Sequence, residues 1–242
     1  FLLIVQFQTL FISVNHFLNS ILSNSFPMQK PFQFAEGFLS TPRTLQLWAS
    51  AMVVLPVFLQ APWVHLHPIS ACLFTFVLLG TGFALVHFGA EKWLQVGSLL
   101  VGVSGSWLGG CLFWGWLRGH PVLHLPVEAF ALPLAFVGLE TRWRIGASFY
   151  LSCLLGAAFT DLMMLFTGVI DSWPEVVKAS LLDAPQLLHE AAEKLFKLQS
   201  IFMLMVAAVC IFFIAKLMRE RAILHTPSGG AWLVASAALT TT

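Results

Sequence analysis

The chain has 242 residues, of which 58% are hydrophobic and only 10% are charged. Soluble domains carry roughly 25% charged residues, so this composition excludes an ordinary soluble domain and indicates a membrane protein with several spanning helices. A net charge of +1 gives no basis for nucleic-acid binding. The four cysteines lie one to an apolar segment, without C-x-x-C or Cys/His spacing, which argues against a disulfide framework and a metal site.

The first 27 residues contain no Lys, Arg, Asp or Glu, and Met28 begins a stretch that is typical of a natural N-terminus. A secretory signal needs a basic region and a small-residue cleavage site, and neither is convincing here. We therefore interpret residues 1–40 as an N-terminal extension. Its part before Met28 is either not native or an additional apolar helix.

Six segments reach the roughly 20 apolar residues that a spanning helix needs. They cover residues 44–62, 68–88, 93–117, 121–139, 145–170 and 199–217, and they predict an all-α transmembrane bundle over residues 41–220. Pro56, Pro126 and Pro133 fall inside spans and predict kinks. Residues 221–242 are expected to be a flexible C-terminal tail, because their apolar run Ala231–Leu239 is too short to span.

The connection at residues 171–198 is longer and more polar than the others. Ser172 and Asp183 are each followed three residues later by Glu or Gln, as in a capping box at a helix start. Four apolar residues then share one helical face: Leu188, Ala191, Ala192 and Leu195. This pattern predicts two short amphipathic helices at the membrane interface, which either cover the end of the bundle or form a docking surface for a partner.

Lysines and arginines are unevenly divided between the two sides of the predicted bundle. Eight lie on the side that holds both chain termini, and four lie on the other side. Because segments rich in Lys and Arg stay in the cytoplasm, both termini are predicted to be cytoplasmic.

The third and fifth spans carry small residues at every fourth position, which places these residues on one helical face. In lipid, such faces allow two helix backbones to approach closely. We expect them to mediate helix packing within this chain, or a contact with a second copy or another membrane protein. The residues are Ser98, Gly102, Ser106 and Gly110 in the third span, and Ser152, Gly156 and Thr160 in the fifth.

Two acids, Asp161 and Glu128, lie inside the predicted spans. At the rise of an α-helix they lie about 13 Å and about 10 Å from the non-cytoplasmic ends of the fifth and fourth spans. They are therefore expected at similar depths on neighbouring antiparallel helices. His120 and His124 precede Glu128 at four-residue intervals and Arg118 lies just outside. Together these residues form the candidate polar site.

Ionisable residues inside a membrane are costly and are functional candidates. This group could relay protons, bind a substrate, or ligate a pigment or haem through His124 or His87. Alternatively, the two acids only hydrogen-bond across helices and hold the bundle together. The sequence has no G-x-S-x-G, phosphate-loop or H-E-x-x-H motif. We therefore predict no catalytic residue, no metal and no cofactor, and we do not expect an enzyme.

Three stretches together resemble an uncharacterised family of cyanobacterial membrane proteins, the domain of unknown function thirty-one-twenty. They are LWASAMVVLPVFLQAPWV at residues 47–64, residues 110–168 from GCLFWGWLRG to TDLMMLFTG, and the segment with Trp-Pro that follows. The resemblance covers about residues 40–215 and leaves out residues 1–27 and the tail. It implies a photosynthetic bacterial host and a thylakoid or plasma membrane location, and it supplies no activity, cofactor or catalytic residue.

The resemblance makes two functions worth weighing. The first is a non-enzymatic accessory or assembly factor, which contacts a photosynthetic or respiratory complex in the bilayer through the small-residue faces and residues 171–198. The second is a small permease that couples a solute to protons through Asp161 and Glu128, and six spans of this size are compatible with one that forms a homo-oligomer. The sequence favours the accessory role narrowly, because it shows no inverted repeat of the kind found in many transporters.

Overall fold

The structure is a computed structural model that describes residues 42–242 apart from 91–92, 181 and 225–228. The N-terminal extension, and with it the question of the residues before Met28, lies outside the described residues. All regular secondary structure in the described part is helical. The predicted all-α bundle with six membrane-spanning segments is therefore confirmed.

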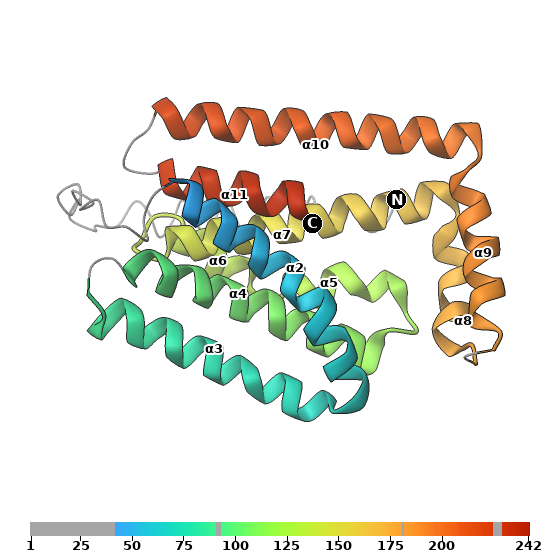
Figure 1. Cartoon of the computed structure of the whole chain (residues 1–242), viewed down its shortest axis with the longest axis horizontal. Helices are drawn as coiled ribbons and strands as arrows, with labels where there is room; N and C mark the ends of the chain where they lie inside the picture. The colour runs from blue at the N-terminus through green and yellow to red at the C-terminus, as the bar shows by residue number, and fades with distance from the viewer. Residues whose placement is uncertain (1–41, 91–92, 181, 225–228) are drawn as a thin grey trace. The chain divides into compact units, whose positions relative to one another are not determined.

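The spanning helices begin and end close to the predicted segments. The first three are α2 (Pro42–Leu66), α3 (Pro68–Phe88) and α4 (Leu94–Leu112), and α4 continues into a π-helical turn at Phe113–Leu117. The fifth and sixth spans are α7 (Arg144–Thr167) and α10 (Leu198–Leu224). These helices run roughly alongside one another (Figure 1). Several expose large apolar side chains, including Phe58, Phe76 and Phe202, as a lipid-facing surface requires.

The fourth span is broken into four short pieces. A 3-10 turn at Pro121–Leu123 leads into α5 (His124–Glu128), and a second 3-10 turn at Ala129–Ala131 leads into α6 (Leu132–Gly138). The N–H of Leu132 bonds to the carbonyl of Ala129 instead of the carbonyl of Glu128, which an α-helix would use. The disturbances predicted from Pro126 and Pro133 therefore occur, whereas α2 stays one continuous helix through Pro56.

Helix α4 packs against α3 on one side and α7 on the other. Its contact with α7 is closest where Gly102 meets Gly146, since a Cβ on Gly102 would lie 2.2 Å from the Gly146 carbonyl oxygen. Beside this crossing, apolar side chains from four helices form the main buried core: Leu45, Ala49, Leu99, Val103, Ile145, Phe149, Ala231, Val234, Ala237 and Ala238.

The connection after α7 forms the two predicted amphipathic helices, α8 (Trp173–Lys178) and α9 (Ala184–Leu195). They lie across one end of the spans (Figure 1). The capping boxes predicted at Ser172 and Asp183 do not form, because both residues have helical backbone angles and make no side-chain cap. The Ser172 hydroxyl instead accepts a hydrogen bond from Lys194 Nζ at 2.6 Å.

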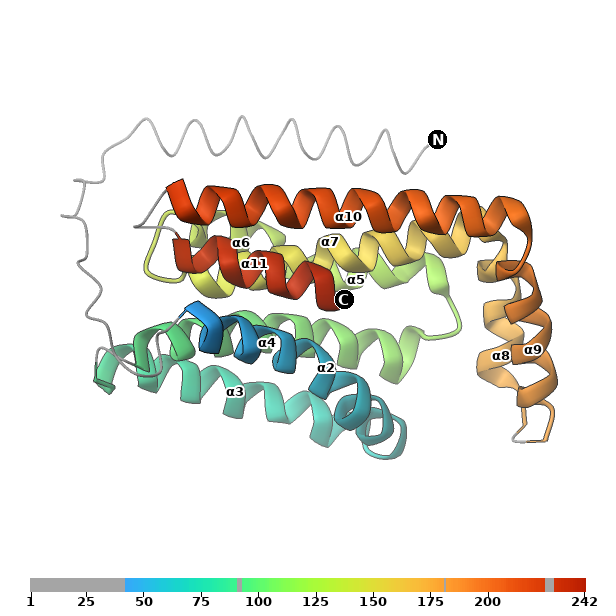
Figure 2. The same cartoon turned by 45° about the horizontal axis from the view of Figure 1, so that its top comes forward.

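The prediction of a flexible C-terminal tail is wrong for residues 229–241, which form helix α11 (Gly229–Thr241). This helix packs among α2, α7 and α10 (Figures 1 and 2), and Val234 and Ala238 are fully buried. Its 13 residues reach about 20 Å, so it is too short to cross a bilayer, as its apolar run predicted. Thr242 lies against Gly156, near the middle of α7. Although α11 does not span, it turns back into the bundle and is buried there.

Candidate intramembrane polar site

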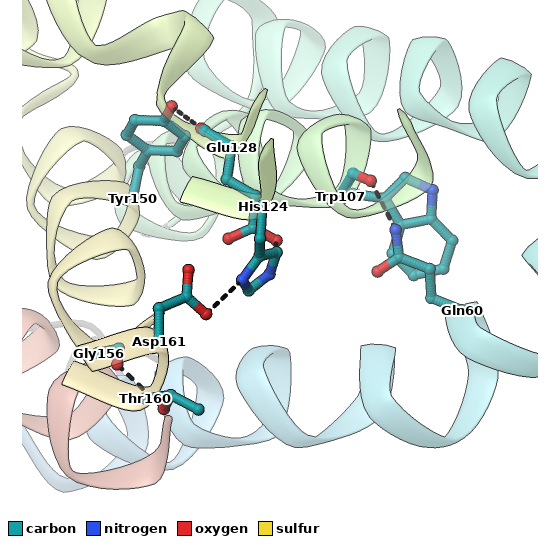
Figure 3. A network of polar contacts seen from close by, with 8 residues as sticks. All are labelled: Gln60, Trp107, His124, Glu128, Tyr150, Gly156, Thr160 and Asp161. Carbon is teal, nitrogen blue, oxygen red and sulfur yellow. Dashed lines mark hydrogen bonds and ion pairs between the residues drawn. The ribbon is translucent and has the colours of Figure 1, made fainter. Parts of the chain in front are cut away.

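His124 lies between the two predicted acids and contacts both of them (Figure 3). Its Nδ1 is 2.8 Å from Asp161 Oδ1, and its Nε2 is 3.2 Å from Glu128 Oε1. The structure therefore brings together Asp161, Glu128 and His124, which we call the His124 cluster. The two carboxylates meet through the imidazole and not directly.

Two helices position the His124 cluster. His124 and Glu128 are the first and last residues of α5 and lie one helical turn apart, so their side chains share a face. Asp161 lies on α7, six residues before its last residue Thr167, which is about 9 Å of helix. The side chains of His124, Glu128 and Asp161 are 20%, 20% and 23% exposed, so the cluster is half-buried below one end of the bundle.

The contacts of His124 restrict where protons can be. A neutral imidazole donates through one nitrogen and accepts through the other, whereas an imidazolium donates through both. The His124 cluster therefore contains either an imidazolium between two carboxylates, or a neutral imidazole between a carboxylate and a protonated acid. These forms differ only in where a proton lies, so the three side chains together can take up, hold and pass on a proton.

The structure does not bring Arg118 and His120 into the cluster. Arg118 Nη1 is 2.8 Å from His65 Nδ1, and its carbonyl oxygen accepts a hydrogen bond from Trp173 Nε1. His120 is exposed and precedes the first helical turn with non-helical backbone angles. The prediction that His120, His124 and Glu128 share one helical face required His120 to be part of the helix. The first helical turn begins only after His120.

Tyr150 was missed by sequence reasoning, although it is the only tyrosine in the chain. Its hydroxyl donates a hydrogen bond to the carbonyl oxygen of Glu128 and accepts one from the N–H of Ala131 at 3.2 Å. Both backbone groups lie at the break in the fourth span, and Figure 3 shows the bond to Glu128. A lone tyrosine in an otherwise apolar span was the available signal, because a buried hydroxyl needs a partner.

Small residues on α4 allow these elements to come close. A Cβ on Gly109 would lie 3.0 Å from Glu128 Cα, and one on Gly105 would lie 3.2 Å from the Tyr150 ring. The ring of Phe113, at the start of the π-helical turn, lies 4.5 Å from the His124 imidazole between centroids. The small surface of α4 thus forms one wall of the site.

The predicted packing residues are placed mostly inside the bundle. Ser98 is fully buried and its hydroxyl accepts a hydrogen bond from the Gly146 N–H, and Gly110 packs on the side chain of Gln60. Gly102 faces α7 and Gly156 faces Thr242. Ser152 is buried and Ser106 is half-buried. Thr160, however, is exposed, and its hydroxyl bonds back to the Gly156 carbonyl.

Gln60 is a second polar residue that the sequence analysis missed. It is buried within α2, and its amide nitrogen donates to the Trp107 carbonyl oxygen at 2.6 Å and to Cys111 Sγ at 3.1 Å (Figure 3). This amide joins α2 to α4 on the side of α4 away from the His124 cluster. One amide among apolar residues was the signal that could have found it.

The imidazoles considered as pigment or haem ligands already have hydrogen-bond partners at both nitrogens. Both nitrogens of His124 face carboxylates. His87 Nδ1 is 3.0 Å from the Phe83 carbonyl oxygen, and its Nε2 is 2.7 Å from Arg142. Ligation by either residue would have to break one of these contacts. In the described ranges, no group of three or more His, Cys, Asp or Glu is arranged to hold a metal ion.

Comparison with known proteins gives a family and no activity. Neither the curated proteins nor the solved structures contain a significant match. One family model, described as a protein of unknown function (DUF3120), matches residues 49–242. The match extends through α11, so the limit near residue 215 suggested by the resemblance was too short. Since it covers most of the sequence, the chain belongs to the DUF3120 family of proteins of unknown function.

Proposed function

We propose that this integral membrane protein is a non-enzymatic permease that moves a small solute together with protons, and that the His124 cluster takes up and releases those protons. The proposal rests on one observation. A single imidazole contacts carboxylates from two different spans, at a depth where ionisable groups are costly.

The surroundings of the cluster support a transport role over a purely structural one. The side chains of the cluster are not fully enclosed by the protein, so a proton donor or acceptor outside the chain can reach them. The cluster also lies where the fourth span is broken. In many transporters, substrate and coupling-ion sites are formed where spanning helices are interrupted. If the cluster only joined helices, neither its partial exposure nor its place at the broken span would be needed.

The contacts of His124 support a proton transfer in two steps. A proton taken up at Asp161 Oδ1 passes to His124 Nδ1 while His124 Nε2 releases its own proton to Glu128 Oε1. The imidazole ends in the other tautomer, and the reverse transfer or a turn of the ring resets it. Each step uses a contact of 3.2 Å or less, within reach of direct proton transfer.

The substitution Asp161→Asn tests this function. Asn keeps the shape of the side chain and cannot exchange a proton. Proton entry into liposomes containing the purified protein is measured without solute, as the uncoupled leak through the cluster, driven by a valinomycin potential and followed with a trapped pH dye. It should fall at least tenfold. The melting temperature in detergent should change little. Asp171→Asn makes the same change at an exposed residue beyond α7 and should leave proton entry unchanged. Equal proton entry in the parent and Asp161→Asn proteins would overturn the proposal.

A second candidate, an accessory or assembly factor, has one observation in its favour. Large apolar side chains are exposed around α9, including Leu182 (91%), Phe196 (77%) and Leu198 (85%), and exposed apolar groups of this kind often mark interaction sites. Co-migration with a larger complex on a native gel of solubilised membranes would support this role. Migration as a monomer or as a homo-oligomer alone would count against it.

The proposed location follows from the family resemblance and from charge. We propose a thylakoid or plasma membrane of a cyanobacterium. Lys216, Arg219 and Arg221 at the end of α10 favour the cytoplasm for that end, from which α11 turns back into the bundle. The His124 cluster then lies nearer the opposite side. Cleavage of an added protease site before Pro42 by protease supplied from the cytoplasmic side tests this orientation.

A further inference from the structure

The break in the fourth span leaves two backbone groups, the Glu128 carbonyl and the Ala131 N–H, with only the 3-10 contact to each other inside their own span, at a depth where water is scarce. Because Leu132 N–H bonds to the Ala129 carbonyl, the carbonyl of Glu128 has lost its α-helical partner. The N–H of Ala131 is likewise bonded outside its own helix. In a bilayer, backbone groups without partners are costly, and irregular backbone persists only where the protein satisfies those groups.

One side chain adds a hydrogen bond to each of these two groups. The Tyr150 hydroxyl donates to the Glu128 carbonyl oxygen and accepts from the Ala131 N–H, so it bridges the two sides of the break. A hydroxyl has one proton to donate and can accept in the same geometry, and both capacities are used here. Tyr150 belongs to α7, which also carries Asp161.

We propose that Tyr150 is a positioning residue that fixes the break in the fourth span and thereby places the Glu128 carboxylate against His124. The hydroxyl holds the backbone of Glu128 itself, so the position of that carboxylate depends on it directly. His124 is one turn earlier and contacts Asp161 through its own side chain. Loss of the hydroxyl should therefore separate Glu128 from His124 and leave the His124–Asp161 contact in place.

Packing against α4 fixes the positions of the Tyr150 ring and of the Glu128 backbone relative to each other. Gly105 faces the Tyr150 ring and Gly109 faces Glu128 Cα, and the two glycines lie one turn apart on the same helix. The ring and the backbone it holds therefore rest on one surface. A shift of the ring by a few tenths of an ångström would change the reach of the hydroxyl to both backbone groups.

The test is Tyr150→Phe, which removes the hydroxyl and keeps the ring. Infrared spectra of the purified protein in lipid at acidic pH show the protonated carboxyl groups, and Glu128→Gln and Asp161→Asn assign the two bands by removing them. In Tyr150→Phe the Glu128 band should shift and the Asp161 band should stay in place. The matched control is Thr167→Val, which removes an α7 hydroxyl that bonds only to its own helix at Met163 and Met164 and should move neither band.

Gly105→Ala provides a second variant that keeps the hydroxyl and presses on the ring, whose nearest atoms would lie 3.2 and 3.3 Å from the new Cβ. It should shift the Glu128 band in the same direction by a smaller amount. Unchanged bands in Tyr150→Phe, or equal shifts of both bands, would overturn the positioning role.

The effect of Tyr150 on proton transport rests on the proposed function, and it is measured in a separate assay. Tyr150→Phe should lower proton entry into liposomes at least fivefold, with Thr167→Val unchanged. If the parent protein moves no protons, the proposed function fails, while the infrared bands still decide the role of Tyr150.

Discussion

Helix α7 meets two of its neighbours, α4 and the fourth span, in opposite ways. Its contact with α4 is close and made by small residues, since the Gly146 backbone approaches Gly102 so nearly that a Cβ would lie 2.2 Å from a carbonyl oxygen. Its contact with the fourth span depends on polar side chains, because Tyr150 bonds to the broken backbone and Asp161 bonds to His124.

The difference follows from how each neighbour satisfies its own backbone. Helix α4 is continuous over Leu94–Leu112, so it needs no outside partner there and can present a surface of small residues. The fourth span is interrupted at Ala129–Ala131, so α7 must supply hydrogen-bonding groups to it. The ionisable residues lie beside the interrupted helix, and the continuous helix serves as the rigid surface on which they are arranged.

The largest effect is expected from Gly102→Ala. The added methyl group would clash with the backbone of Gly146, which cannot move without separating α4 from α7. Overpacking of this kind costs about 1–3 kcal/mol or more, so we expect a clearly lower melting temperature and less folded protein in the membrane. Gly80→Ala is the matched control, because nothing lies within 4 Å of its Cβ position. It should be neutral or slightly stabilising, and equal losses in the two variants would contradict the close crossing.

Gly109→Ala is expected to lower stability less than Gly102→Ala does, and to disturb the position of Glu128 more. The new Cβ would lie 3.0 Å from Glu128 Cα and 3.4 Å from Glu128 Cγ, so α5 must shift slightly away from α4. We expect a loss of about 1 kcal/mol, in the usual range for single substitutions, together with a reduced rate of proton entry into liposomes. An unchanged rate in a folded protein would show that the position of Glu128 is not limiting.

Much of the fold could be predicted because the bilayer imposes a simple length rule. Segments of about 20 apolar residues are expected to span, and the described helices begin and end near the predicted segments. The pairing of Asp161 with the fourth span also followed from helical rise and antiparallel order, since these place Glu128 and Asp161 at similar depths.

The parts that failed depend on exact backbone geometry or on tertiary contacts. The spacing of His120 and His124 assumed a helix that in fact begins at Pro121. Ser172 matched a capping pattern, yet its hydroxyl binds Lys194 from another helix. Helix α11 was too short for the spanning rule, and only its fit among α2, α7 and α10 makes it stable. Local patterns contain none of this information, because each outcome depends on groups far away in the sequence.

The smallest effect is expected at the end of α7, where contact is made by a long flexible side chain. Lys194 of α9 donates to the carbonyl oxygen of Gly168 at 3.0 Å and to Ser172 Oγ. Gly168 ends α7 with a φ of +71°, so Lys194 binds the carbonyl at the turn where α7 ends. Hydrogen bonds to charged groups contribute about 1.5–3 kcal/mol, but solvent screens this half-buried ammonium.

We therefore expect Lys194→Met to cost about 1 kcal/mol or less and to leave the melting temperature of the spans nearly unchanged. Its effect should instead be local, as faster protease cleavage in the exposed turn between α8 and α9. Lys197→Met, at an exposed residue just beyond α9, controls for the loss of a positive charge and should cleave at the parent rate. If Lys194→Met lowered the melting temperature as much as Gly102→Ala, the end contact would be as important to the bundle as the glycine crossing. The contrast between a rigid interface of small residues and adaptable polar ones along α7 would then be wrong.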